Sequence, residues 1–389
     1  MKTWHIITGE YPPAAGGVSD YCAHVAAGLV SAGDDVHVWC PSVSGTAASD
    51  TNGVHVHAIA GSWGPADRDR IDAALNQLPG QKHLLVQWVP HAFGARSMNI
   101  GFCRWMRRHA RGGDVLDVMV HEPGLGFGEG SLRHNAAAAV HRVMLALLLN
   151  RARRVWISIP AWADVMRPWA FGRRDLPFLW LPVPSNIPVQ ALNGQVASRR
   201  AEMLRGADGV ILGHFSTYPS STRVALRELL PALLSAAPTL HVQLLGRGAD
   251  QAALELKPAL GVHKSRVHAS ADLTSTQMSR DLQSCDLLVQ PYTDGVSSRR
   301  GTLMAALAHG LPVVTTTGRL SEPFWKDSDS VVALPPGDLP GMARTILELA
   351  SQPERRSQVA VAARTTYERR FSLERLIQAL RSDTCAVTL

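Results

Sequence analysis

A polar loop at residues 292–301 holds the side chains in this sequence that are best suited to chemistry. It follows an apolar run at 287–289 and precedes a short helix, expected over 302–309, that Gly310 ends. Serine hydroxyls, guanidinium groups and the N–H groups that open a helix all donate hydrogen bonds to phosphate. The segment therefore predicts a phosphate-binding loop at the carboxyl end of a parallel strand, where α/β proteins bind ligands. The candidate binding residues are Tyr292, Asp294, Gly295, Val296, Ser297, Ser298, Arg299, Arg300, Gly301 and Thr302.

Two arginines of this loop, Arg299 and Arg300, stand beside the N-terminus of the expected helix. Cations are electrostatically disfavoured at that end of a helix. An anion held between the guanidinium groups and the helix would remove the conflict, so we assign both arginines to charge stabilisation. The alternative is that both are solvated surface charges.

A glycine pair, Gly16-Gly17, follows the first apolar run at 4–8 and precedes a helix expected over 21–31. Glycines let a ligand approach the backbone closely, and the N–H groups ahead of a helix carry partial positive charge. The pair predicts a second ligand-binding loop. The alternative is a sharp turn, because the pair lacks the G-x-G-x-x-G pattern of dinucleotide sites.

A His-Glu-Pro turn, with His121 and Glu122 as candidate site residues, directly follows an apolar strand expected over 115–120. An imidazole at the end of a strand can bind a hydroxyl group or stabilise developing charge. The alternative is a turn with a surface histidine, since the chain has 16 histidines.

Two further loops follow strands in the second half of the chain. A strand at 210–212 leads into the loop 213–222, and a strand at 241–245 ends at a Gly-Arg-Gly turn. We expect both at the same sheet edge as the polar loop. The alternative for the first loop is a capped helix start, and we interpret Arg223 and Arg227 as the solvated basic face of that helix. The candidate ligand-binding residues here are Gly213, His214, Ser216, Thr217, Gly246 and Arg247.

Strand-length apolar runs alternate with helical patterns along the whole chain. This alternation predicts an α/β protein with two Rossmann-like domains, each a doubly wound parallel sheet. We place the first domain at 1–189 and the second at 190–370. Residues 189–205 are polar, and we expect them to be irregular.

The composition describes a globular protein with a cationic excess. The 389 residues are 46% hydrophobic and 18% charged, with a net charge of +7 and a pI near 9.5. This excess suits an anionic ligand, an anionic membrane surface or nucleic acid. Basic segments at 104–111, 151–154 and 167–174 are best interpreted as solvated helix faces, with a membrane-surface or anionic-acceptor face as the alternative. No nucleic-acid-binding motif accompanies them, so we expect no nucleic-acid partner.

Other patterns narrow the class of protein. The five cysteines are scattered, which argues against a disulfide framework or a zinc site and fits a reducing cytosol. No signal-peptide pattern and no membrane-spanning apolar run is present. The sequence also lacks a P-loop, H-E-x-x-H and a clear catalytic carboxylate pair, so we expect neither a bound metal nor a hydrolase of the common types.

Three motifs carry a family resemblance that spans essentially the whole chain. They are GGVSDY at 16–21, HEP at 121–123 and MAALAHGLPVVTT at 304–316. Together with the two tandem domains, they resemble the GT-B retaining glycosyltransferases, most closely family four. The closing FSLERLIQAL resembles the helix that crosses back to the N-terminal domain in this fold, so we expect a helix at about 371–389 on that domain.

The resemblance implies two Rossmann-like domains that face a central cleft. It implies transfer of a hexosyl unit, with retention, from a UDP- or GDP-linked sugar to a hydroxyl acceptor that is a glycan, lipid-linked or small molecule. The nucleotide-sugar is a co-substrate, and no cofactor or metal is expected. The location would be cytoplasmic, with a peripheral contact at the inner membrane face. By the same resemblance, Gly16 and Gly17 approach the donor phosphates, His121 contacts the transferred sugar, and residues 297–301 bind the diphosphate and sugar.

The chain departs from the family at an E-x₇-E pair. Counting back from Gly310, the two glutamate positions are held by Ser297 and Ala305. The basic pair that usually follows the first strand of the second domain is also missing, and Arg299 and Arg300 are the candidates to supply its charge. Two alternatives therefore stay open: a non-catalytic binding or scaffold protein, and a nucleotide-sugar epimerase or hydrolase of the same fold.

Overall fold

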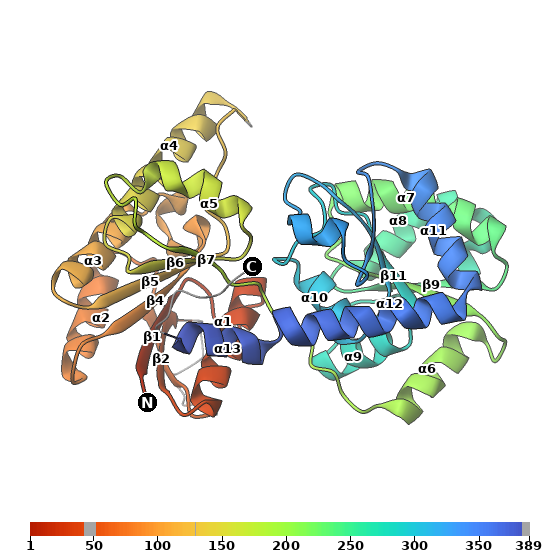
Figure 1. The fold of residues 1–389 in the computed structure, drawn as a ribbon, viewed down its shortest axis with the longest axis horizontal. Helices are drawn as coiled ribbons and strands as arrows, with labels where there is room; N and C mark the ends of the chain where they lie inside the picture. Colours follow the sequence, from red (N-terminus) through yellow and green to blue (C-terminus); the bar gives the residue numbers. More distant parts are fainter. Residues whose placement is uncertain (43–51, 129, 383–389) are drawn as a thin grey trace. The chain divides into compact units, whose positions relative to one another are not determined.

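A computed structural model describes residues 1–42, 52–128 and 130–382. The chain divides into two compact units, each built on one sheet (Figure 1). The first unit contains residues 1–182 and the helix that begins at Leu373, and the second contains residues 183–372. Residues 383–389 of the expected terminal helix, with Cys385, lie outside the described residues.

The first sheet has seven strands in the order β3-β2-β1-β4-β5-β6-β7, and every pairing is parallel. The second has six strands in the order β10-β9-β8-β11-β12-β13, again all parallel. In each sheet the first strand along the chain, β1 or β8, lies inside the sheet, and later strands are added first on one side of it and then on the other, as in doubly wound folds. The predicted fold class of two parallel α/β domains is confirmed. The strands are β1 (Thr3–Thr8), β2 (Asp35–Pro41), β3 (His55–Ala60), β4 (His83–Trp88), β5 (Val115–Val120), β6 (Arg154–Ile157), β7 (Phe178–Trp180), β8 (Val210–Phe215), β9 (Leu240–Leu245), β10 (Val267–Ser270), β11 (Leu287–Gln290), β12 (Val313–Thr316) and β13 (Val332–Leu334).

Helices connect the strands in both units. Those of the first unit are α1 (Gly17–Ser31), α2 (Pro65–Gln77), α3 (Ile100–Arg111), α4 (Leu132–Leu149), α5 (Ala161–Met166) and α13 (Leu373–Arg381), with short 3₁₀ turns η1 (Pro90–Phe93), η2 (Ala95–Ser97) and η3 (Arg167–Trp169). Those of the second unit are α6 (Asn193–Leu204), α7 (Ser220–Ala236), α8 (Ala249–Leu260), α9 (Ser275–Gln283), α10 (Gly301–Ala308), α11 (Leu339–Ser351) and α12 (Pro353–Thr366), with η4 (Gly261–Arg266), η5 (Pro323–Lys326) and the π-helical turn η6 (Tyr367–Phe371).

The core of the first unit forms because its strands are mostly apolar and most of their residues are buried on both faces, as expected for parallel strands between helix layers. Helices α2, α3 and α4 share one core with the sheet, which includes Trp63, Trp88 and Trp105. Helices α1 and α13 pack against each other, and a Cβ on Gly28 would lie 2.9 Å from Ile377. Glycine at that position lets the two helices approach closely.

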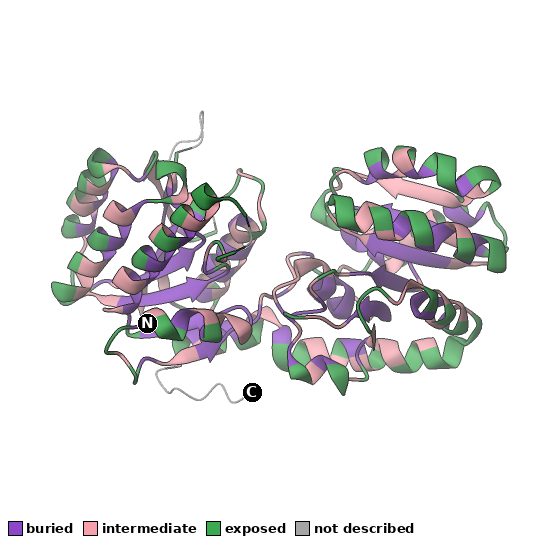
Figure 2. Ribbon diagram, turned by 90° about the horizontal axis from the view of Figure 1, so that it is seen from above, coloured by how far each residue is buried: buried purple, intermediate pink, exposed green. Residues whose placement is uncertain are grey.

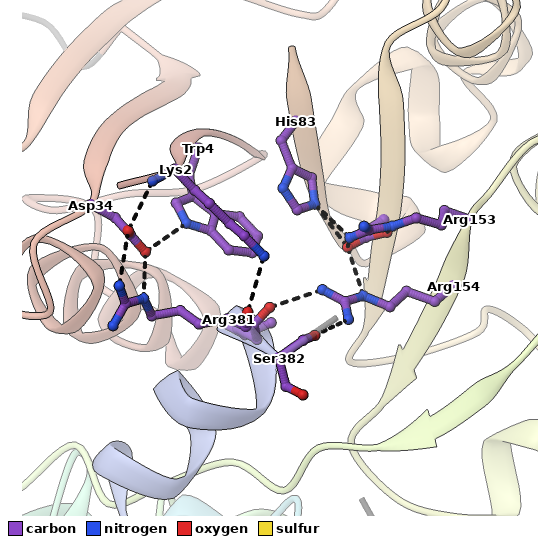
Figure 3. Close-up of polar contacts among 10 residues, drawn as sticks. Lys2, Trp4, Asp34, His83, Arg153, Arg154, Arg381 and Ser382 are labelled. Carbon is purple, nitrogen blue, oxygen red and sulfur yellow. Dashed lines mark hydrogen bonds and ion pairs between the residues drawn. The ribbon is translucent and has the colours of Figure 1, made fainter. Parts of the chain in front are cut away.

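The C-terminal end of α13 is held by cations of the first unit (Figure 3). Arg154 donates to the carbonyl oxygens of Leu380 (2.9 Å) and Ser382 (2.8 Å), and Lys2 Nζ donates to that of Arg381 (3.0 Å). The last carbonyls of a helix carry partial negative charge and lack intrahelical donors. These contacts fix the helix on the first unit.

A buried carboxylate supports this contact from within the sheet (Figure 3). Asp117 is fully buried and accepts hydrogen bonds from His83 (2.9 Å), Arg153 (3.0 Å) and Arg154 (2.8 Å). Burial opposes its ionisation, but the hydrogen bonds and positive charges prevail and lower the pKa of Asp117 well below its usual range. The carboxylate is therefore ionised and orients Arg154 toward α13.

One sequence expectation about an element was wrong. Residues 189–205 are not irregular, because α6 covers most of them and is held by ion pairs of Arg199 with Asp281 (3.5 Å) and Arg200 with Asp286 (3.0 Å). The closing helix, expected from about residue 371, begins at Leu373, directly after the π-helical turn at residues 367–371. Among the described residues, no helix is long and apolar enough to cross a membrane.

Candidate functional site

The candidate donor-binding loops of the second unit follow β8, β9 and β11 at the carboxyl edge of the second sheet. Strand β8 pairs with both β9 and β11, so these loops are neighbours. A Cβ on Gly246, which has φ +101°, would lie 2.4 Å from the Ser216 carbonyl oxygen. Only glycine fits there, since both the space and the positive φ exclude a side chain. The structure thus brings three of the predicted loops together.

Within the loop 292–301, both arginines are already paired with a carboxylate. Arg299 Nη2 lies 2.6 Å from Asp294 Oδ2, and Arg300 Nη2 contacts Asp294 Oδ1. The guanidinium of Arg300 also lies over the Tyr292 ring at 4.7 Å, and the Tyr292 hydroxyl hydrogen-bonds with Thr302 Oγ1 at 2.8 Å. In this structure, Asp294 of the same loop is therefore the anion that both arginines bind.

A second carboxylate, Glu322, anchors the loop from the segment after β12. It is 4% exposed and accepts hydrogen bonds from the Ser298 N–H (3.0 Å), the Ser298 hydroxyl and Trp325 Nε1 (2.6 Å). Burial raises the pKa of Glu322, and the hydrogen bonds from Ser298 and Trp325 oppose that rise. The sequence analysis missed Glu322 because this residue lies outside every motif and contacts the loop only in the folded protein.

Gly295 and Val296 set the shape of this loop, whereas the Ser297 hydroxyl and the N–H groups at the start of α10 can still form hydrogen bonds. Gly295 has φ +91°, and a Cβ there would lie 2.3 Å from the Gly318 nitrogen. Val296 is buried and donates its N–H to the Thr316 carbonyl (2.7 Å). Ser297 is fully buried, and its hydroxyl has no partner among the described residues. Helix α10 begins at Gly301, and a helix start leaves N–H groups without acceptors in the helix.

Two predicted site residues lie inside β8 and not in a loop. A Cβ on Gly213 would lie 2.7 Å from Cys285 Sγ, which identifies close packing as the reason for glycine. His214 is buried, its Nδ1–H donates to the Val289 carbonyl (2.7 Å), and burial lowers its pKa to about 4. By contrast, Thr217 and Arg247 are exposed beyond the strand ends. Gly213 and His214 therefore support the sheet beneath the loops.

In the first unit, the glycine pair opens α1 beside a carboxylate. Gly16 is the N-cap of α1, and a Cβ on it would lie 2.7 Å from both carboxylate oxygens of Glu10. Glu10 Oε1 also accepts a hydrogen bond from the Ser19 N–H (3.2 Å). A Cβ on Gly17 would instead meet open space, because no atom of the described residues beyond its chain neighbours would lie within 4 Å of it. Glu10, which sequence reasoning missed, thus supplies an anion at this helix N-terminus.

His121 lies at the end of β5 in a neutral, oriented state. Its Nε2–H donates to Gln87 Oε1 (2.9 Å), and its ring meets the Tyr21 ring edge-on at 4.7 Å. Its carbonyl oxygen accepts from Trp162 Nε1 (3.0 Å). Burial lowers the pKa of His121 to about 3. Gln87 at the end of β4 is the orienting residue that sequence reasoning missed, and the adjacent Glu122 is exposed.

No group of three or more histidine, cysteine, aspartate or glutamate side chains in residues 1–42, 52–128 and 130–382 is arranged to hold a metal ion. The candidate site groups at the carboxyl ends of the strands in both sheets are instead hydrogen-bond donors, neutral imidazoles and paired ions. Such groups can bind and orient a polar ligand and stabilise negative charge.

Comparison with solved structures defines the fold. The chain is similar to a sucrose-phosphate synthase from Thermosynechococcus elongatus, with 16% identity, coverage of 98% of this chain and 97% of that one, and a TM-score of 0.71. It is similar to Anabaena HepE in complex with UDP-glucose, with 15% identity, coverage of 98% of each chain and a TM-score of 0.66. It is also similar to WaaG, a glycosyltransferase involved in lipopolysaccharide biosynthesis, with 13% identity, coverage of 99% and 100%, and a TM-score of 0.62. The chain has the GT-B fold.

The part of the sequence that matches a known family lies in the second unit. Residues 208–352 match the model of the family "Glycosyl transferases group 1". That segment runs from just before β8 through α11 and contains the loop 292–301 and Glu322. No curated protein sequence matches the chain.

Proposed function

We propose that this protein is a glycosyltransferase that moves a hexosyl unit from a UDP- or GDP-linked sugar to a hydroxyl acceptor, with retention of anomeric configuration. The observation that carries the proposal is the loop 292–301, which ends at the N-terminus of α10 inside the segment that matches the glycosyltransferase family. HepE, which has a similar fold, is described in complex with UDP-glucose, and this supports a nucleotide-diphosphate sugar as donor. We extend the proposal to a glycan, lipid-linked or small acceptor and to reaction without metal.

The donor diphosphate would be bound by groups of this loop. The N–H groups of Gly301 and Thr302 open α10, and helix N-termini attract phosphate. A diphosphate carries more negative charge than the single carboxylate of Asp294, so it competes for the guanidinium groups of Arg299 and Arg300. Transfer of both arginines to the diphosphate would stabilise the charge that develops on the leaving group.

His121 would act through hydrogen bonding and not through positive charge, because its pKa of about 3 keeps the ring neutral at physiological pH. Its Nε2–H is committed to Gln87 Oε1 at 2.9 Å. Nδ1 is then the unprotonated nitrogen and can accept a hydrogen bond from a sugar hydroxyl. Gln87 is a positioning residue in this proposal.

A second candidate function is that of a non-catalytic binding or scaffold protein. The observation in its favour is that Asp294 neutralises both loop arginines while Glu322 occupies the Ser298 N–H. Ser297 and Ala305 also supply no acidic side chain at the two family positions. Asp294 and Glu322 thus supply the negative charge for this loop without any bound ligand, as a non-catalytic protein would allow.

Titration calorimetry with UDP-glucose and a GDP-linked hexose, in the presence of EDTA, tests the donor proposal. We expect binding that the double variant Arg299→Ala/Arg300→Ala weakens about a hundredfold, since hydrogen bonds to charged groups contribute about 1.5 kcal/mol or more each. The control is Arg344→Ala/Arg369→Ala, which removes two exposed arginines of the same unit. Equal affinities for both double variants would refute the role of the loop arginines.

Product analysis separates the enzyme classes. The anomeric configuration of the product, read by NMR, tests retention once an acceptor is supplied. Free sugar or an epimerised donor in the absence of acceptor would identify the hydrolase or epimerase alternative. Absence of binding for every nucleotide-sugar would favour the scaffold function.

A further inference from the structure

Two histidines lie side by side at the amino ends of neighbouring strands in the second sheet. His241 is the second residue of β9, and His268 is the second residue of β10. His241 Nδ1 and His268 Nε2 lie 3.3 Å apart, and the two rings stack with their centroids 5.6 Å apart. The candidate donor loops follow the carboxyl ends of the parallel strands in this sheet, so the histidine pair lies toward the opposite edge.

The contact between the rings leaves one further N–H group in either tautomer. If His241 Nδ1–H donates to His268 Nε2, then His268 carries its proton on Nδ1; if the direction is reversed, His241 carries its proton on Nε2. No other hydrogen bond to either ring is present within the part of the chain that the structure describes. Strand β10 is the edge strand, and its four residues are only half-buried, shown in pink in Figure 2. Solvent therefore reaches this part of the sheet.

Positive charge converges on the two rings from other segments of the second unit. Burial and then the charges of Arg266 and Arg205 lower the pKa of His241. Burial and then the neighbouring ring lower the pKa of His268, and Arg199 and Arg205 lower it further. Arg205 is therefore close to both rings.

Two of these arginines already have partners in the fold. Arg199 pairs with Glu202 at 2.8 Å and with Asp281 at 3.5 Å, and Glu202 is the acidic group that raises the pKa of the nearby histidine on β10. Arg266 donates to four main-chain carbonyl oxygens and contacts His263 Nδ1 at 2.8 Å. Carbonyl oxygens carry no net charge, so the positive charge of Arg266 is not cancelled by these contacts.

Arg205 is the cation that is open to a ligand. It is exposed, and among residues 1–42, 52–128 and 130–382 no hydrogen bond or ion pair to its side chain is present. Its backbone is left-handed, with φ 53° at the C-cap of α6, and glycine is the residue favoured there. Residues other than glycine that adopt this conformation cluster at functional sites. The chain thus places a guanidinium where the backbone alone favours glycine.

We propose that His241, His268 and Arg205 bind a phosphate group of a small ligand at the amino edge of the second sheet. The free N–H of the ring pair and the planar fork of Arg205 donate hydrogen bonds to phosphate oxygens. The fixed charge of Arg266 adds to the attraction, and the two negative charges of a phosphate suit this excess of cations. A ligand bound here does not compete with a nucleotide-sugar at the loop 292–301. The site is independent of the proposed sugar transfer.

NMR of the histidine rings tests this site, with the full-length protein and inorganic phosphate as the probe. The variants His241→Gln and His268→Gln identify the two ring signals. We expect both signals to move on titration with phosphate at constant ionic strength. We also expect their midpoints of protonation to rise in saturating phosphate, because a bound anion favours the charged imidazole. Signals that do not move, or midpoints that do not change, would overturn the proposal.

The variant Arg205→Gly separates ligand binding from a structural role of this residue. Glycine suits the left-handed backbone, so the variant should melt close to the temperature of the unaltered protein. It should bind phosphate about tenfold more weakly, because it lacks a charge-assisted hydrogen bond. The control Arg227→Gln removes an exposed guanidinium of the same unit and should bind phosphate like the unaltered protein. Equal affinities for the two variants would exclude Arg205 from the site.

The same titration in the variant Arg299→Ala/Arg300→Ala removes the candidate donor loop as a second phosphate site. We expect the signals of His241 and His268 to report the same phosphate affinity in that variant. Loss of their response would show that they report on the donor loop, and it would overturn the separate site. The result does not depend on whether a nucleotide-sugar binds, so it stands apart from the calorimetric test of the donor.

Discussion

Replacement of Glu322 by Gln is the sharpest test of how the candidate donor loop is held. The buried carboxylate accepts from the Ser298 N–H at 3.0 Å, from the Ser298 hydroxyl and from Trp325 Nε1 at 2.6 Å. A glutamine offers one acceptor oxygen, so its NH₂ group must face one of these donors. The variant thus loses a charge-assisted hydrogen bond and leaves a buried donor unsatisfied.

The magnitude follows from these two losses. A hydrogen bond to a charged group contributes about 1.5–3 kcal/mol, and an unsatisfied buried donor costs about 1–3 kcal/mol. Relief from burying the negative charge of Glu322, whose pKa burial raises, offsets part of this cost. We expect a net loss of about 3 kcal/mol, which lowers the melting temperature of a domain of this size by about 6–12 °C.

Differential scanning calorimetry measures this change, and Glu348→Gln is the matched control. Glu348 pairs with Arg355, and both side chains are close to half exposed. Such a surface pair contributes no more than about 1 kcal/mol. If Glu322→Gln and Glu348→Gln shift the melting temperature equally, Glu322 does not anchor the loop, and the reasoning is refuted.

Two further predictions concern buried groups of the structure. Burial lowers the pKa values of His5, His121 and His214 to about 3, 3 and 4, below the unfolded value of 6.5. Their contribution to stability is therefore complete above pH 6.5 and is lost as pH falls toward the folded values, with a slope of up to about 4 kcal/mol per pH unit. Urea unfolding at pH 7 and pH 5 measures it, and equal midpoints would contradict the neutral, buried state. Replacement of Arg154 by Met should raise hydrogen exchange throughout α13, whereas Arg375→Gln on the exposed side of that helix should not.

The alternation of apolar runs and helical patterns was enough to predict the two parallel sheets. Strands such as β1 and β5 are mostly apolar and are buried on both faces, and this pattern is typical of strands covered by two helix layers. The pattern failed at α6, whose residues are mostly polar. That helix is held by ion pairs with Asp281 and Asp286, more than eighty residues away in sequence, which local periodicity does not register.

For the candidate site, the sequence identified the loops but not the residues that complete them. Loop positions are visible because glycines, prolines and polar residues interrupt apolar strands. The sequence did not identify Glu10, Gln87 or Glu322 as site residues, because the residues around them form no recognisable motif. Each matters only through a contact with Ser19, His121 or Ser298, and those contacts depend on how strands are ordered in the sheet.

The two-sheet architecture, the polar loop 292–301 and the cationic excess could all be read from the chain alone, because periodicity, turn residues and charge are local properties. What those features contact depends on the folded arrangement. In the folded protein, Asp294 pairs with Arg299 and Arg300, and Glu322 accepts a hydrogen bond from the Ser298 N–H, although these groups were expected to bind a phosphate. Three separate basic segments meet at the C-terminal end of α4. Pairing of distant residues is set by strand order and helix packing, which is why no local pattern could predict it.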